Sequence, residues 1–150
     1  MNIVITITEK PLDPESADMA VRQYSNGAVV TFLGTTRDNT DDRKVLHLVY
    51  EAYRPMADRK LAEIAAEVNE RWAIKDVFIS HRLGRIEIGE ISLVVAVSSV
   101  HRKDSFTACQ YIVDRIKQTV PIWKKEFFEG GEVWVDSPED LALRDGKSTH

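Results

Sequence analysis

The sequence predicts one α+β domain with a mixed, mainly antiparallel sheet and two principal helices. The chain has 150 residues, of which 43% are apolar, so it can bury one sizeable core but is too short to suggest two. Segments with the two-residue period of a strand alternate along it with segments of helical period. Because no internal repeat, low-complexity segment or linker divides the chain, we expect these elements to pack as a single domain.

A first strand and a short helix are expected before the second strand begins. Ile3, Ile5 and Ile7 alternate with other residues in "NIVITIT", which predicts a strand with one buried face. Asp13 and Pro14 then supply an N-cap and a first-turn proline. The helix that they begin should end near the Asn-Gly pair at residues 26–27.

Two further strands are predicted on either side of a polar loop. The stretches "GAVVTFLGTTR" and "VLHLVYEAY" predict the second and third strands. The run "DNTDDRK" between them is polar throughout and predicts a loop.

The first long helix is predicted over residues 56–72, with two strands after it. "DVFISHR" and "ISLVVAVSS" predict these strands, and Gly84 and Gly89 mark the connection between them. Four apolar residues recur at helical spacing and make the helix amphipathic: Leu61, Ile64, Ala65 and Val68.

The second long helix is predicted over residues 104–120, and Pro121 ends it because proline disfavours helical backbone in the preceding residue. "KEFFEGGEVWV" then predicts a hairpin, with Gly130 and Gly131 in its turn. Residues 136–150 are polar and irregular and predict a tail, which leaves residues 1–135 as the folded domain. The core-facing side of the helix should carry Phe106, Cys109, Val113, Ile116 and Val120.

The distribution of charge and apolar residues argues against two classes of partner. A net charge of −4 disfavours nucleic-acid binding, which needs a basic face to displace counterions. No apolar run approaches the roughly 20 residues that cross a bilayer, so no membrane span is expected. Positive charge is nevertheless concentrated in residues 101–125, which carry a local charge of +4 while the remainder carries −8.

The single cysteine and the N-terminus both favour a cytoplasmic protein. Cys109 has no partner for an internal disulfide or a CxxC-type site, which fits a reducing compartment. Its place in the apolar pattern "FTACQYIVDRI" favours a buried small hydrophobe over a nucleophile. The opening "MNIVITITEK" lacks the basic start, long apolar stretch and cleavage site of a signal peptide.

A candidate anion site lies in "SSVHRKDSF", where an apolar strand meets the second long helix. The amides at a helix start are unpaired donors with partial positive charge, so His101, Arg102 and Lys103 are unfavourable there unless an anion joins them. Such a cluster suits a phosphate or a carboxylate. The alternative is that these side chains point into water.

Lys117 and Lys124 form a second candidate cluster at the end of the same helix. Lys117 lies at the margin of the apolar stripe, so its stem can lie on the core while its amine reaches a pocket. Pro121 redirects the chain before Lys124, which allows both amines to point to one place. Trp123 can face a planar heterocycle or pack in the core. Arg37, at the end of a predicted strand, can bind a ligand or remain solvated.

Other kinds of site have little support. The 4 histidines of the chain are scattered and have no metal-ligand spacing. Neither a GxGxxG nor a GxxxxGK[ST] motif is present. Ser98, Ser99 and His101 lie together, but no acid is placed to orient the histidine and nothing resembles a nucleophile elbow. We therefore expect neither a metal enzyme, nor a nucleotide-triphosphate enzyme, nor a hydrolase.

Five stretches together resemble the large, catalytic subunit family of molybdopterin synthase. They occur in the order and rough spacing of that family over about residues 27–135: "GAVVTFLGTTR", "YEAYRPMA", "HRLGRIEIGE", "VSSVHRKDSF" and "IKQTVPIWKKE". The last two are specific. The resemblance implies an α/β hammerhead-like domain that forms a homodimer. It also implies that each end of the dimer binds one small ubiquitin-like sulfur-carrier subunit, which gives a heterotetramer.

The resemblance also implies a reaction. The C-terminal Gly-Gly of the carrier ends in a thiocarboxylate that enters the pocket of the large subunit. Sulfur from two carriers converts cyclic pyranopterin monophosphate into the dithiolene of molybdopterin. Because sulfur arrives on the partner, no cofactor, metal or cysteine of the large subunit is implied. The family's substrate-binding positions fall on Arg37, His101, Arg102, Lys117 and Lys124, of which Lys117 and Lys124 are also implied to be catalytic.

Some features of the chain depart from the family or leave alternatives open. Thr36 stands where similar sequences more often carry an aliphatic residue, and "DNTDDRK" is unusually acidic for the edge of an anion pocket. Phe127, Phe128 and the strand "EVWV" can face the carrier or pack within the hairpin. The basic cluster also suits an anion-binding regulatory module for a phosphorylated metabolite, without catalysis. A third possibility is an enzyme in which Lys117 attacks a carbonyl substrate to form a Schiff base.

Overall fold

A computed structural model describes residues 2–135, and the predicted tail of residues 136–150 lies outside the described residues. The elements follow in the order β1 (Asn2–Thr8), α1 (Pro14–Val21), β2 (Ala28–Thr35), β3 (Asn39–Thr40), β4 (Arg43–Ala52), α2 (Arg54–Arg71), β5 (Asp76–Arg82), β6 (Gly84–Glu87), β7 (Ile91–Ser99), α3 (Arg102–Thr119), β8 (Ile122–Phe128) and β9 (Gly131–Val135). Among these helices, none is long and apolar enough to cross a membrane.

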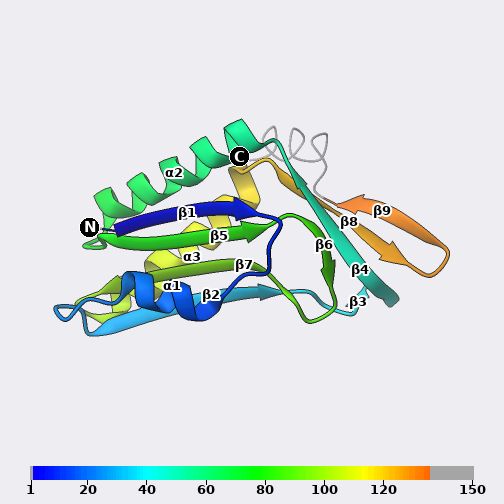
Figure 1. The fold of residues 1–150 in the computed structure, drawn as a ribbon. Helices are drawn as coiled ribbons and strands as arrows, with labels where there is room; N and C mark the ends of the chain where they lie inside the picture. The colour runs from blue at the N-terminus through cyan, green and yellow to red at the C-terminus, as the bar shows by residue number, and fades with distance from the viewer. Residues whose placement is uncertain (1, 136–150) are drawn as a thin grey trace.

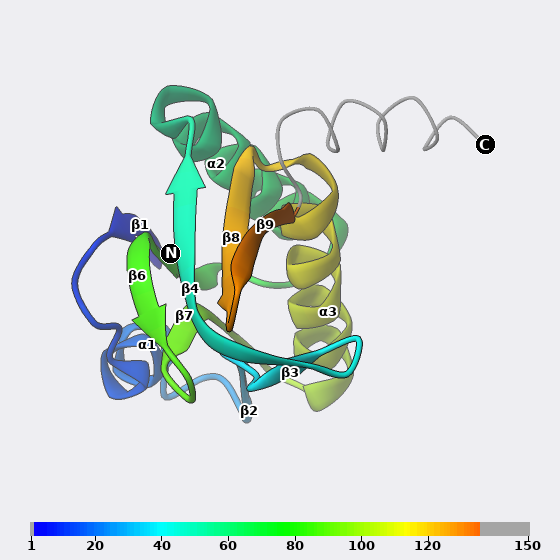
Figure 2. The same ribbon diagram turned by 90° about the vertical axis from the view of Figure 1, so that its right-hand side faces the viewer.

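The strands form two sheets (Figure 1). The first has the order β1-β5-β7-β2, in which β1 and β5 are parallel and the other neighbours are antiparallel. The second has the order β3-β4-β8-β9, with β6 on the other edge of β4, and all its pairs are antiparallel. It lies beyond the ends of the first sheet's strands, beside α3 (Figure 2). The predicted mixed, mainly antiparallel α+β architecture is confirmed, with the strands divided between two sheets.

Helices cover both faces of the first sheet. The long helices α2 and α3 pack on one face over the main core, and α1 packs on the other over a smaller cluster around Phe78 and Val94. The prediction that β1 has a single buried face is therefore wrong, because side chains on both of its faces pack against a cluster of buried residues. Ile7 is buried, Val4 packs towards α1 from the opposite face, and Ile3 is 39% exposed. The central strands β5 and β7 are buried along nearly their whole length because both of their faces are covered.

The short helix α1 begins where the sequence predicts and ends earlier. The Asp13 carboxylate accepts a hydrogen bond of 3.0 Å from the Glu15 amide, and Pro14 follows it at the first helical position. The helix ends at Val21, which lies at the α1 face of the first sheet, rather than near residues 26–27.

One predicted core position of α3 is wrong. Phe106 is 62% exposed, whereas its neighbour Ser105 is buried. From Ser105 the buried residues of the helix recur at three- and four-residue spacing. Because a single step turns the helix by about 100°, Phe106 leaves the sheet-facing stripe. Cys109, Ile116 and Val120 are buried as predicted. The buried positions within the helix are Ser105, Ala108, Cys109, Ile112 and Ile116.

The polar run at residues 38–44 forms a tight hairpin rather than the predicted loop. Asn39 pairs with Lys44 and Thr40 with Arg43, so two residues make the turn. Asp41 and Asp42 both have positive φ, of 50° and 65°. A two-residue turn of this kind needs positive φ at both positions, and aspartate tolerates that backbone better than most residues. The connection after β5 likewise contains a strand, β6, that the sequence does not predict.

The packing of α3 on the first sheet predicts a clear contrast between two alanine substitutions. Ile112 is fully buried in the main core, so Ile112→Ala should lower the free energy of unfolding by about 2–5 kcal/mol. Gln110 is exposed on the same helix, and Gln110→Ala should change it by less than about 0.5 kcal/mol. Urea denaturation at neutral pH measures both values, and equal effects would show that the assigned helix face is wrong.

Candidate active site

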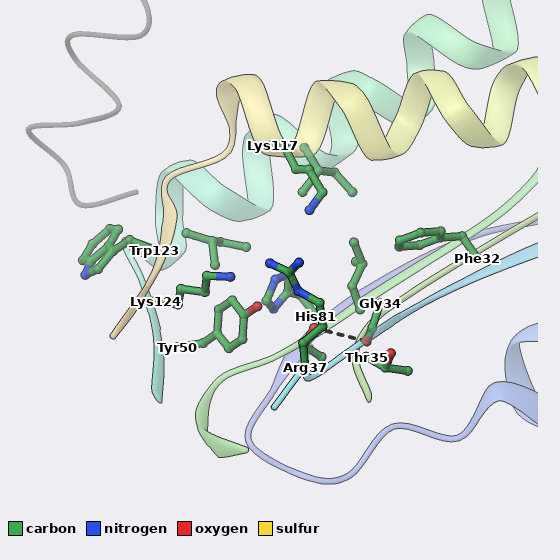
Figure 3. Close-up of a pocket in the computed structure, with 13 residues that line it drawn as sticks. Phe32, Gly34, Thr35, Arg37, Tyr50, His81, Lys117, Trp123 and Lys124 are labelled. Atoms are coloured by element: carbon green, nitrogen blue, oxygen red, sulfur yellow. Dashed lines mark hydrogen bonds between the residues drawn. The ribbon is translucent and has the colours of Figure 1, made fainter. Parts of the chain in front are cut away.

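A cavity of about 270 Å³ lies where the end of α3 meets the two sheets. Its walls come from segments far apart in the sequence, so only the folded chain forms it (Figure 3). The lining mixes apolar and aromatic side chains with polar and charged ones. The lining residues are Phe32, Gly34, Thr35, Arg37, Tyr50, His81, Ser92, Leu93, Ile116, Lys117, Ile122, Trp123 and Lys124.

Three cationic side chains enter this cavity from three different elements. Arg37 follows the end of β2, Lys117 lies in the last turn of α3, and Lys124 lies on β8. In Figure 3 the ends of all three point into the same space. The predicted convergence of Lys117 and Lys124 across Pro121 is therefore found in the fold, together with Arg37.

The local structure explains how these positions are fixed. Lys117 lies at the C-terminal end of α3, where the partial negative charge of the helix favours a cation. The helix stops at Pro121, and β8 then pairs with β4 so that Lys124 stands opposite Tyr50. Trp123, whose role the sequence left open, lines the cavity. Both Arg37 and Lys117 are exposed, so the cavity is open to solvent rather than largely dry.

The described residues that line the cavity carry a net positive charge. None of the described residues that line it is acidic. One described carboxylate lies close to these cations: Oε2 of Glu126 is 3.9 Å from Nζ of Lys124. Glu126 is buried and accepts a hydrogen bond of 3.0 Å from the Thr40 hydroxyl at the acidic hairpin. An anionic ligand would therefore gain favourable electrostatic energy in this cavity.

His81 also lines the cavity, and the sequence reasoning did not single it out. It is buried on β5 and lines the cavity, with its ring edge-on to Tyr50 at 5.0 Å between centroids. Burial, together with the nearby positive charge of Lys117, lowers the pKa of His81 to about 4. The imidazole is therefore neutral at pH 7. The available signal was a histidine close after the apolar residues of the strand "DVFISHR", and it was set aside with the other histidines.

Two of the five predicted substrate-binding residues lie elsewhere in the chain. His101 and Arg102 are exposed at the start of α3. Arg102 and Lys117 are 15 positions apart on one helix, which separates them by about 22 Å. The expectation that all five residues form one cavity is therefore wrong for a single chain. Only Arg37, Lys117 and Lys124 meet.

The chain is similar to proteins of one family. Residues 7–119 match the family model described as MoaE protein. The molybdopterin synthase catalytic subunit of Bacillus subtilis (strain 168) is 46% identical over 142 residues, which cover 94% of this chain and 90% of that protein. The crystal structure of molybdopterin synthase from Staphylococcus aureus has a TM-score of 0.81 and 44% identity, and the match covers 89% of this chain and 95% of that one.

A more distant structure shares the fold alone. It is a complex of subunits 1 and 2 of the molybdopterin-converting factor from Helicobacter pylori, with a TM-score of 0.69 and 18% identity. The match covers 89% of each chain.

The buried neutral imidazole predicts a specific pH dependence of stability. The pKa of His81 is about 4 in the folded chain against an ordinary value of 6.5, so unfolding takes up a proton between these two values. The free energy of unfolding should therefore fall as the pH is lowered from about 6.5 to about 4, by on the order of 3 kcal/mol.

The matched variant for this measurement is His81→Asn. Its amide can still donate to the carbonyl that His81 Nδ1 contacts, but it does not titrate. Urea denaturation of both proteins at several pH values between 4 and 7 gives the comparison. The variant should lose distinctly less stability than the wild type on acidification, and parallel losses would mean that His81 does not cause the effect.

Proposed function

Because the chain belongs to the MoaE family of molybdopterin synthase catalytic subunits, we propose that it transfers sulfur from a carrier protein to cyclic pyranopterin monophosphate. The family makes it an enzyme, a transferase of molybdenum cofactor biosynthesis. The proposed sulfur donor is the C-terminal thiocarboxylate of a small ubiquitin-like carrier. The proposed product is the dithiolene of molybdopterin.

One observation carries this proposal: Arg37, Lys117 and Lys124 face one cavity that no described acidic residue lines. Both reactants are anions, because the pterin carries a phosphate and the carrier tail a thiocarboxylate. Their binding relieves the repulsion among the cations. Once the bound reactants exclude water, each preorganised cation can lower the reaction barrier by on the order of 3 kcal/mol.

Each cation has a proposed role. Arg37 holds phosphate oxygens, for which its planar guanidinium offers paired donors. Lys117 adjoins the thiocarboxylate carbon and the substrate carbon that receives sulfur, where it acts as a nucleophile, a proton donor or an electrostatic partner. Lys124 binds the pterin or stabilises developing negative charge.

The properties of Cys109 support a sulfur source outside this chain. Burial raises the pKa of its thiol to about 11, and its Sγ lies 3.9 Å from the Val95 carbonyl oxygen inside the core. A buried, protonated thiol is a poor nucleophile. The single cysteine also fits the reducing, cytoplasmic setting that we infer for the reaction.

The carrier is proposed to bind at the second sheet. An extended tail can pair with a strand edge and deliver its end into the cavity next to β8. On β9, at the edge of the described sheet, Val133 and Trp134 are 36% and 39% exposed. Phe127 stacks on His47 and Phe128 lies under Arg43, so β9 supplies the better candidates for the carrier-facing surface.

We propose that a homodimer, within a heterotetramer with two carriers, completes the site. The strand β2 is at the edge of the first sheet, and Val29 and Leu33 on it are exposed. In an antiparallel pair of β2 strands, the start of one strand lies beside the end of the other. Because Ala28 pairs with Ser99, this arrangement brings His101 and Arg102 of a second copy towards Arg37. The two residues would then bind the phosphate across the interface.

Reconstitution tests the proposed function. The chain is mixed with a thiocarboxylated carrier and cyclic pyranopterin monophosphate, and the product is identified by mass. We expect the dithiolene to form. Binding of the pterin phosphate without any sulfurated product would instead support the anion-binding regulatory module.

Substitution of the central lysine should separate chemistry from assembly. Lys117→Ala should reduce sulfur transfer by at least about a hundredfold, because one cation at the reacting atoms is lost. Carrier binding should persist, since the proposed docking surface is on β9. The control is Lys60→Ala, which removes a partly exposed lysine of α2 that does not line the cavity and should leave turnover unchanged. Near-normal turnover of Lys117→Ala would remove its catalytic role.

Mixed dimers test whether the site is shared between copies. Lys117→Ala and the double variant His101→Ala, Arg102→Ala should each be nearly inactive alone. In a dimer of one copy of each, one of the two shared sites retains all of its residues, so activity should return to about half of the wild-type value per mixed dimer. Mixtures that stay inactive although heterodimers form would show that both sets of residues act within one chain.

A further inference from the structure

The cavity contains a buried acceptor, a ring nitrogen of His81, that the cations do not explain. Arg37, Lys117 and Lys124 can only donate hydrogen bonds. The hydroxyls of Thr35, Tyr50 and Ser92 can both donate and accept, and that of Ser92 donates to the Gly34 carbonyl at 3.2 Å. His81 is different, because it is 5% exposed and still lines the cavity with a ring nitrogen available. A purely anionic ligand would satisfy the cations and leave this nitrogen unused.

The hydrogen bonds of His81 fix which nitrogen accepts. Nδ1 lies 2.9 Å from the carbonyl oxygen of Arg82. Since a carbonyl only accepts, Nδ1 carries the proton of the neutral ring and donates it. Nε2 therefore has a lone pair. None of the hydrogen bonds formed by the described residues uses Nε2.

The surroundings hold the ring in this orientation. Its edge-on packing with Tyr50, at an interplanar angle of 69°, restricts rotation of the imidazole. In Figure 3 the ring lies at the floor of the cavity, with the Tyr50 hydroxyl directed towards it. A flip of the ring would place a carbon against the Arg82 carbonyl and leave that oxygen without its donor, which is costly for a buried group.

We propose that Nε2 of His81 accepts a hydrogen bond from an N–H or O–H group on the ring system of the pterin substrate. The substrate is that of the proposed function, on which this role of His81 depends. A reduced pterin has such donors at its edge, whereas a fully ionised phosphate and a thiocarboxylate have none. His81 thus selects the heterocycle, while the three cations select its charge. It is a specificity-determining residue rather than a group that moves a proton.

A neutral acceptor suits this position better than a carboxylate would. A carboxylate would form ion pairs with the cations and cancel the field that attracts the phosphate. A neutral imidazole leaves that field in place and still offers a directed lone pair. It also discriminates strongly, because a ligand that fills the floor without a donor would bury Nε2 unsatisfied.

Two variants of one residue test the proposal by calorimetry. His81→Asn keeps an amide donor near the position of Nδ1 and removes the acceptor at the position of Nε2. His81→Gln has a longer side chain that returns an amide oxygen towards the cavity. The ligands are cyclic pyranopterin monophosphate and inorganic pyrophosphate, an anion without a ring. Turnover of the wild type with a thiocarboxylated carrier is measured alongside.

We expect His81→Asn to weaken binding of the pterin phosphate roughly 10- to 100-fold, because one hydrogen bond is lost and a buried donor of the ligand is left unpaired. His81→Gln should recover most of that affinity, and neither variant should change binding of pyrophosphate. Wild-type affinity of His81→Asn for the pterin would overturn the proposal, as would an equal loss for both ligands. A wild type that neither binds nor converts the pterin would overturn the proposed function, and this role of His81 with it.

Nitrogen NMR of the wild type gives a second measurement that does not depend on variant folding. With ¹⁵N-labelled histidine, the Nε2 resonance should move upfield when the pterin phosphate binds, because its lone pair becomes a hydrogen-bond acceptor. The Nδ1 resonance should stay near its position. Saturating pyrophosphate should not produce the upfield shift. An unchanged Nε2 resonance in the pterin complex would overturn the proposal.

Discussion

Three positive charges face one cavity, and the fold has to hold them there against their mutual repulsion. The three side chains lie on or just after three different elements. Local features offset part of their positive charge. The C-terminal end of α3 favours Lys117, and the buried Glu126 lies behind Lys124. His81 avoids adding a fourth charge by remaining neutral. An anionic ligand relieves the remaining repulsion among the cations. The electrostatic energy that destabilises the empty cavity therefore adds to the free energy of binding the proposed substrate.

In the proposed reaction, the carrier protein provides the reactive sulfur, and this chain provides the positive charge that stabilises the reactants. The sulfur arrives already activated as a thiocarboxylate, and this chain also supplies its position. The cavity accordingly combines cations with apolar and aromatic side chains such as Phe32 and Trp123 that can contact a planar ring, and Cys109 is left as a core residue. In the proposed site, the cations bind the negative charge of the ligand, and the neutral imidazole of His81 binds a hydrogen-bond donor on its ring. Different residues of the same cavity therefore recognise these two properties.

The sequence predicted the parts of the site that depend on local signals. Pro121 ends the helix and redirects the chain. That turn allowed the prediction that Lys117 and Lys124 could point into one cavity. The failures came from tertiary geometry. His101 was expected in the same cavity although it lies at the opposite end of α3 from Lys117. His81 was missed because its place in the cavity depends on tertiary packing and not on sequence spacing. Asp41 shows a third case, in which a polar run formed a hairpin because aspartate tolerates positive φ.

The most direct test of the electrostatic account is a crystal structure of the protein with bound cyclic pyranopterin monophosphate. The account predicts that ligand oxygens lie about 3 Å from nitrogen atoms of Arg37, Lys117 or Lys124, inside the cavity at the end of α3. It would be contradicted by a ligand seated instead in a second hollow of the described chain, lined by Met19 and Tyr24, with the cationic cavity left empty.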